Sequence, residues 1–185
     1  AILTLSKANS RFKAFDGFDL QKAQYFIRLK FYQAASDVLI GLARTDYANL
    51  NRILDLSGQL RRVKAYPAAL KVLETMHLLY PQNALILSEL GFTHMAENRF
   101  YAAALLFEQA AMIDAKFYVE AAELFMRSGH HIRAESLNSR IRDQKQKLSQ
   151  RLAILIDRQH FEKAATMQQD LERAGSLDDE NIVYA

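Results

Sequence analysis

The side chains best suited to metal binding or acid–base chemistry are the five histidines, and two of them, His130 and His131, are adjacent. Adjacent residues on a helix point about 100° apart, so this pair cannot readily chelate one ion. His77, His94 and His160 are too scattered along the chain to predict as partners. We therefore expect both adjacent histidines to pack or to face solvent, and we predict no metal site.

Other catalytic patterns are missing from the sequence. The five glycines after Gly17 are isolated and form no phosphate-binding loop, and no serine or threonine lies in a nucleophile motif. The pair Asp178-Asp179 is typical of the charges at a helix start. The chain has no cysteine, which excludes disulfides, thiolate metal sites and a cysteine nucleophile. We predict a protein that is not an enzyme and needs no cofactor.

Composition and charge leave the partner and the compartment open. The 185 residues carry a net charge of +3, which favours anionic partners slightly and falls short of a nucleic-acid signature. A cysteine-free chain suits the cytosol and the periplasm equally well. No apolar stretch approaches the roughly 18 residues that a membrane-spanning helix needs.

One basic run could meet phosphates or acidic lipid headgroups. It consists of Arg140, Arg142, Lys145, Lys147 and Arg151. Asp143 interrupts it and no aromatic residues are interleaved for base stacking, so the pattern favours the solvated face of a long helix.

A motif that occurs four times indicates the elements that position these side chains. In each copy, an aromatic residue is followed three positions later by alanine. Its copies are Tyr32-x-x-Ala35, Tyr66-x-x-Ala69, Phe100-x-x-Ala103 and Phe161-x-x-Ala164. The first three copies are 34 residues apart. A helical unit that repeats at this interval predicts an all-α stack of helix-turn-helix units.

The unit that begins at Ala84 shows the pattern most clearly. One stripe of a first helix consists of Leu87, Leu90, Gly91 and His94, at steps of three and four residues. After the break at Glu97-Asn98, a second stripe consists of Phe100, Ala103, Phe107 and Ala110. The small residues Gly91 and Ala103 would let the two antiparallel helices approach closely.

This unit resembles the tetratricopeptide repeat family. The resemblance rests on Leu90-Gly91, Phe100, Ala103, Phe107 and Ala110, and on Pro81, which stands where that family ends a unit. It implies a right-handed superhelical solenoid of about five antiparallel helix pairs over residues 16–175. The units would begin near residues 16, 50, 84, 115 and 145.

The two ends of the chain carry separate expectations. Residues 1–15 contain enough apolar side chains for a capping helix or half of an earlier repeat. Residues 176–185 begin like a further helix that is cut after about one turn. The apolar Ile182-Val183-Tyr184 would allow dimerisation or continuation of the array there.

The resemblance also implies where a partner binds, because in this family the first helix of each pair lines a concave groove. We predict a protein or peptide partner with apolar anchors and some negative charge. The anchors would meet Phe92, Met95 and Met126, with arginines setting the orientation. The full predicted groove set is Arg28, Asn51, Arg61, Arg62, Ser88, Phe92, Met95, Lys116, Glu123, Met126 and Arg127. For Phe92 and the methionines, simple packing against the adjacent repeat is the alternative.

Two further functions stay open. Ala121-Ala122-Glu123, Ser128-Gly129 and Ala134-Glu135-Ser136 resemble the last repeat of type III secretion chaperones, over about twenty residues. This similarity implies a secretion-type chaperone or an assembly factor for an envelope complex. The basic run implies instead an RNA- or membrane-associated helical repeat, whose binding would fall steeply with salt.

Overall fold

The computed structural model describes residues 16–45, 47–141, 144–157 and 159–175. These residues form helices and turns, and no strand occurs among them. The chain divides into two compact units, residues 1–99 and residues 100–185. The expectations for residues 1–15 and 176–185 lie outside the described residues.

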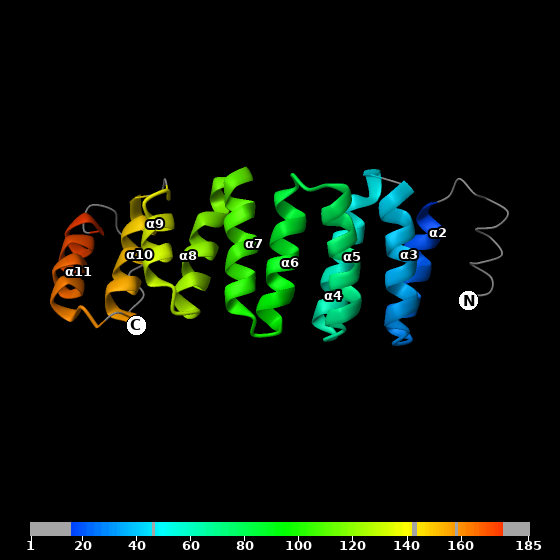
Figure 1. Ribbon diagram of the computed structural model, residues 1–185, viewed down its shortest axis with the longest axis horizontal. Coiled ribbons are helices and arrows are strands. Elements are labelled where there is room, and N and C mark those ends of the chain that lie inside the picture. Colours follow the sequence, from blue (N-terminus) through cyan, green and yellow to red (C-terminus); the bar gives the residue numbers. More distant parts are fainter. Residues whose placement is uncertain (1–15, 46, 142–143, 158, 176–185) are drawn as a thin grey trace. The chain divides into compact units, whose positions relative to one another are not determined.

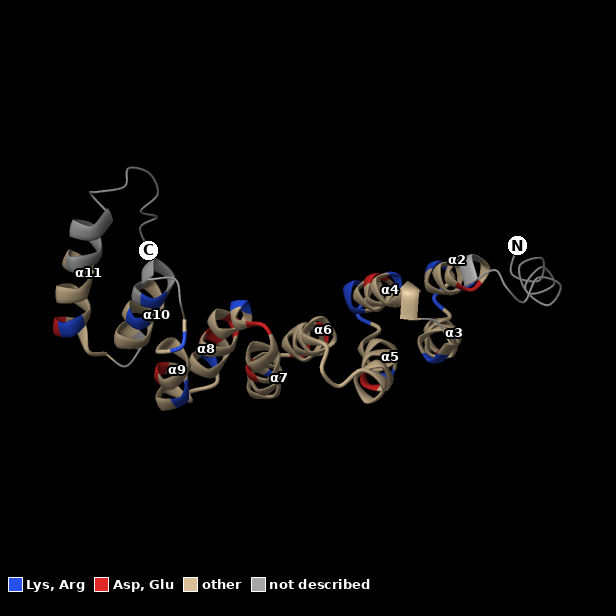
Figure 2. Ribbon diagram, turned by 90° about the horizontal axis from the view of Figure 1, so that it is seen from above, with Lys and Arg blue, Asp and Glu red and all other residues tan. Residues whose placement is uncertain are grey.

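The first unit contains five α-helices: α2 (Asp16–Arg28), α3 (Tyr32–Thr45), α4 (Leu50–Arg62), α5 (Tyr66–Leu79) and α6 (Ala84–Ala96). A 3₁₀ turn, η1 (Tyr47–Asn49), precedes α4. Helix α2 pairs with α3 and α4 with α5, and α4 also packs beside both α2 and α6 (Figure 1). The first helices of successive pairs therefore share one face, which we call the first-helix face, while α3 and α5 form a second layer behind α2 and α4 (Figure 2).

The second unit contains α7 (Phe100–Ile113), α8 (Tyr118–Arg127), α9 (His131–Asn138), α10 (Gln144–Asp157) and α11 (Phe161–Gly175). A 3₁₀ turn, η2 (Ala115–Phe117), separates α7 from α8. Asp114 caps this turn by accepting a hydrogen bond from the Lys116 amide at 3.2 Å. Helix α8 packs against α7, α9 and α10, and α10 packs against α11.

The core explains why the aromatic-x-x-alanine motif recurs. Helices α3, α5, α7 and α11 each begin at the aromatic residue of one copy. The four alanines, Ala35, Ala69, Ala103 and Ala164, are all buried. A small buried residue in the first turn of each second helix allows the neighbouring helix to pack closely.

The turns inside the helix pairs repeat one backbone conformation. Lys30, Lys64, Asn98, Gly129 and Gln159 have positive φ angles between 59° and 80°. In the α2–α3 turn, the Phe31 amide donates to the Phe26 carbonyl at 2.8 Å and the Lys30 amide to the Ile27 carbonyl at 3.0 Å. This is the Schellman pattern, and the same pair of hydrogen bonds closes the other four turns. The left-handed residues are 34, 34, 31 and 30 residues apart.

Within the described ranges, no helix is both long enough and apolar enough to span a bilayer.

Candidate partner-binding surface

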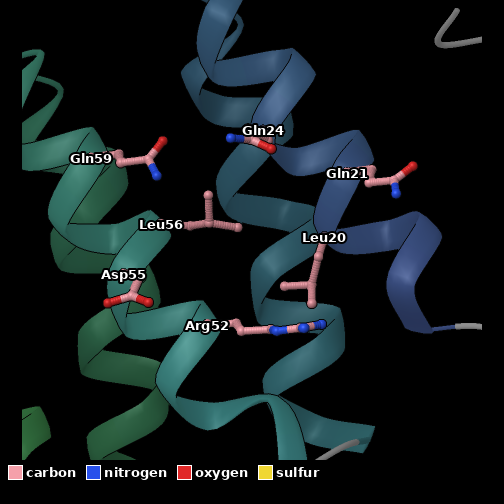
Figure 3. A pocket seen from close by; sticks show the side chains of 7 residues that line it. All are labelled: Leu20, Gln21, Gln24, Arg52, Asp55, Leu56 and Gln59. Carbon is pink, nitrogen blue, oxygen red and sulfur yellow. The ribbon is translucent and has the colours of Figure 1, made fainter.

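A depression of about 310 Å³ lies on the first-helix face of the first unit, between α2 and α4 (Figure 3). Leu20 and Leu56 are its apolar residues, and both are largely buried. Five polar side chains complete the lining: Gln21, Gln24, Arg52, Asp55 and Gln59. Figure 3 shows Leu56 reaching from α4 toward α2 and the Arg52 side chain extending across beneath Leu20.

None of these five polar side chains forms a hydrogen bond or ion pair with another described residue. Side-chain amides carry both a donor and an acceptor, so Gln21, Gln24 and Gln59 can bind backbone N–H and C=O groups of another chain. Arg52 and Asp55 add one unpaired charge of each sign. The depression therefore combines an apolar floor with polar side chains that have no hydrogen-bond partner among the described residues.

Farther along the same face, the polar groups are already engaged. The Arg61 Nη2 donates to Glu89 Oε2 at 3.2 Å, and its guanidinium carbon lies 5.4 Å from the centre of the Phe92 ring. The ion pair and the cation–π contact hold Arg61 and the half-buried Phe92 against each other. Arg61 Nε is buried and lacks a hydrogen-bond acceptor.

The other groove residues predicted in the first unit lie in three environments. Arg28, Asn51 and Arg62 are exposed, and Met95 is half-buried. Ser88 is in the core with 4% of its surface exposed, and its Oγ donates to the Leu85 carbonyl at 2.9 Å. With so little exposed surface, Ser88 packs in the core and offers almost nothing to a partner.

In the second unit, two of the predicted cations already have neighbours. Lys116 Nζ lies 2.7 Å from Asp114 Oδ2 and 4.8 Å from the centre of the Phe117 ring. The Arg127 guanidinium carbon lies 4.3 Å from the centre of the Phe100 ring. Met126 is half-buried. These contacts hold both side chains close to their own unit.

Glu123, the remaining predicted residue, belongs to a group of oxygen acceptors between α8 and α10. Its Oε1 accepts a hydrogen bond from Nε2 of the buried Gln150 at 3.1 Å. Glu123 as a whole is exposed, but partial desolvation of its carboxyl group raises its pKa, the charge of Glu120 adds to this effect and Arg127 opposes it. Glu120 Oε2 and Gln150 Oε1 are buried and lack a donor. The group can accept hydrogen bonds but offers no cation of its own.

Sequence reasoning missed Gln21, Asp55 and Gln150, although one signal could have found them. Gln21, Asp55, Glu89, Glu120 and Gln150 each lie nine residues before the left-handed residue of their turn. This position thus carries an acidic or amide side chain in every helix pair. A comparison aligned on the turns, instead of on the apolar stripe, would have identified it.

The histidine pair shows no metal-binding geometry. The His130 ring stacks on the Tyr101 ring with centroids 4.3 Å apart, and its Nδ1 lies 3.2 Å from Ser128 Oγ. His131 is half-buried. In the part of the chain that the structure describes, no three histidine or acidic side chains are arranged to hold an ion.

The basic run lies partly outside the described residues, since Arg142 and the Lys145 side chain are not described. Arg140 and Arg151 are exposed. Lys147 Nζ donates to the Ser139 carbonyl at 3.4 Å.

Comparisons with known proteins concern the fold alone. No protein-family model and no curated protein sequence matches the chain. A crystal structure of MamA protein superposes with a TM-score of 0.62 at 12% identity, covering 91% of this chain and 98% of that one. A putative kinesin light chain from Podosopora anserina, described as having nearly identical TPR-like repeats, superposes with a TM-score of 0.55 at 16% identity, covering 92% and 98%. MamA from Desulfovibrio magneticus RS-1 gives 0.50 at 18% identity over 76% and 81%. The chain therefore has a tetratricopeptide-like helical repeat fold, and the similarity to type III secretion chaperones stays a prediction.

Proposed function

We propose that the chain is a non-enzymatic scaffold that binds a segment of another protein on the first-helix face of its first unit. The observation that carries this proposal is the depression between α2 and α4, whose five polar side chains have no partner among the described residues. A folded protein normally satisfies its polar groups or leaves them to water on an open surface. Here Gln24 and Gln59 are half-buried, Gln21, Arg52 and Asp55 are exposed, and all five line one hollow beside two leucines.

The hollow suits an extended peptide segment. Glutamine side chains can hydrogen-bond the backbone of such a segment regardless of its sequence, while Leu20 and Leu56 offer apolar contact for one of its side chains. Arg52 and Asp55 would select a segment that carries complementary charge. The half-buried Met95, farther along the same face, adds an adaptable apolar contact.

Affinity capture from the source organism tests the proposal with two matched variants. The double variant Gln24→Ala/Gln59→Ala removes two amides that make no native hydrogen bond, so the fold should be retained. Gln109→Ala removes an exposed amide from α7 and serves as the control. We expect quantitative mass spectrometry to find a protein retained by the unmodified chain and by the control, and lost with the double variant. Identical capture by all three chains would contradict the proposal.

A further inference from the structure

A second surface of the first unit combines exposed cations with exposed apolar side chains at the edge formed by the α2–α3 and α4–α5 turns. The two turns have related sequences, Arg28-Leu29-Lys30-Phe31 and Arg62-Val63-Lys64-Ala65. Both lie along the lower edge of the first unit in Figure 1, as expected for the ends of the neighbouring helices α2 and α4. We call this surface the basic edge.

The apolar side chains of the basic edge are unusually open to solvent. Leu29 is 51% exposed, Phe31 is 57% exposed and Val63 is 45% exposed. They belong to turns that the Schellman hydrogen bonds close tightly, so the backbone holds these side chains outward at the end of the unit.

The cations of the basic edge are unpaired. Arg28, Lys30, Arg62 and Lys64 are exposed, and none of their side chains forms an ion pair or hydrogen bond with the described residues. No acidic residue occurs in segments 20–36 or 56–73, which contain the two turns. Beyond these segments, Asp37 is paired with Lys71 Nζ at 2.8 Å, and Asp19, Asp55 and Glu74 lie at least seven residues from either turn. The two turns therefore carry four positive charges that no acidic residue within them offsets.

We propose that the basic edge docks on an anionic lipid bilayer, with the cations at the phosphate level and Leu29, Phe31 and Val63 inserted just below it. Each lysine or arginine near an anionic membrane adds attraction, and apolar side chains add the short-range component. The centres of protein–protein interfaces are depleted in lysine, which disfavours a protein partner here. Single-stranded RNA sites need a groove with several stacking aromatics, whereas the edge consists of two turns with one exposed phenylalanine. The proposal is independent of the peptide site.

Vesicle flotation tests the proposal with the full chain. The probes are vesicles of phosphatidylcholine alone and vesicles that also contain about 30 mol % phosphatidylglycerol. The second kind has a negative surface potential, as anionic biological leaflets do. Lys30→Gln/Lys64→Gln removes two edge charges, and glutamine suits the left-handed conformation because Gln159 adopts it in the last turn. Arg44→Gln/Lys163→Gln removes the same charge from exposed positions elsewhere and is the control.

We expect binding to the anionic vesicles only, about thirtyfold weaker for the edge variant and within about threefold of the unmodified chain for the control. Phe31→Ser/Val63→Ser should weaken binding while all charges are kept, which separates insertion from simple attraction. No binding to anionic vesicles, or equal loss in the edge variant and the control, would overturn the proposal. Binding of fluorescent oligouridine RNA that is sensitive to the edge variant, without vesicle binding, would also overturn it in favour of nucleic acid.

Discussion

At the scale of the residue, side chains on the first-helix face fall into two groups. Arg61 is held by Glu89 and Phe92, so changing it removes native contacts as well as any contact with a partner. Gln24 and Gln59 have no native contact of this kind to lose. A binding defect in variants of the second group can therefore be attributed to lost contacts with the partner, because the variants lose no native hydrogen bond or ion pair.

Arg133 provides a residue-scale prediction about stability. Its Nε donates to Glu108 Oε1 at 3.3 Å, its Nη2 donates to Glu108 Oε2 at 2.6 Å, and its guanidinium carbon lies 4.9 Å from the centre of the Phe125 ring. Lysine keeps the charge but cannot form both hydrogen bonds to the carboxylate. Arg133→Lys should therefore lower the free energy of unfolding by about 0.5 kcal/mol. The expected loss is modest because the pair is partly exposed. Urea unfolding measures the change. An unaltered midpoint would show that the forked geometry contributes nothing.

Glu123 provides a prediction about pH. Because partial desolvation raises its pKa above the unfolded value, the protonated form stabilises the fold below the unfolded pKa, and this stabilisation is lost as pH rises through the folded pKa. Glu123→Gln keeps an oxygen for Gln150 Nε2 and stays neutral at every pH. We expect the variant to be more stable than the unmodified chain at pH 7, with the difference shrinking toward pH 4. Unfolding curves at both pH values check this, and a gain that is equal at pH 4 and pH 7 would contradict it.

At the scale of the element, the turn inside each helix pair depends on a residue in the left-handed conformation. Gly129 has a φ of 80° and Gly41 lies in helix α3, and a Cβ at either position would meet nothing within 4 Å. The two glycines therefore isolate backbone effects from packing. Gly129→Ala should lower the free energy of unfolding by about 1 kcal/mol, whereas Gly41→Ala should raise it by up to about 1 kcal/mol. Thermal and urea unfolding would measure both, and equal effects of the same sign would disprove the role assigned to the turn.

The helices were more predictable than their surface chemistry. The aromatic-x-x-alanine motif identified α3, α5, α7 and α11, since local spacing determines which residues can share a buried stripe. The turns η1 and η2 were not predicted, because a single 3₁₀ turn has too few residues to show a period. The pairing of Arg61 with Glu89 could not be predicted either, because it joins two repeats and depends on how their helices pack.

At the scale of the whole molecule, the all-α repeat fold was predictable and the ligand was not. A repeating period requires only that each unit bury its stripe against the next unit, so composition and spacing suffice for the architecture. A binding surface depends on which exposed side chains lack partners in the folded chain. That the amides of Gln24 and Gln59 lack a partner became recognisable only once their neighbours were placed.

Site-specific photo-crosslinking tests most directly whether the first-helix face of the first unit holds the partner. p-Benzoylphenylalanine would replace Gln24 or Gln59 on that face and, in separate chains, the exposed Glu74 of α5 or Gln109 of α7. After irradiation in cells of the source organism, we expect a discrete protein adduct from positions 24 and 59 and none from positions 74 and 109. Adducts from position 74 or 109 without any from 24 or 59 would place the partner on a different surface and contradict the proposed function.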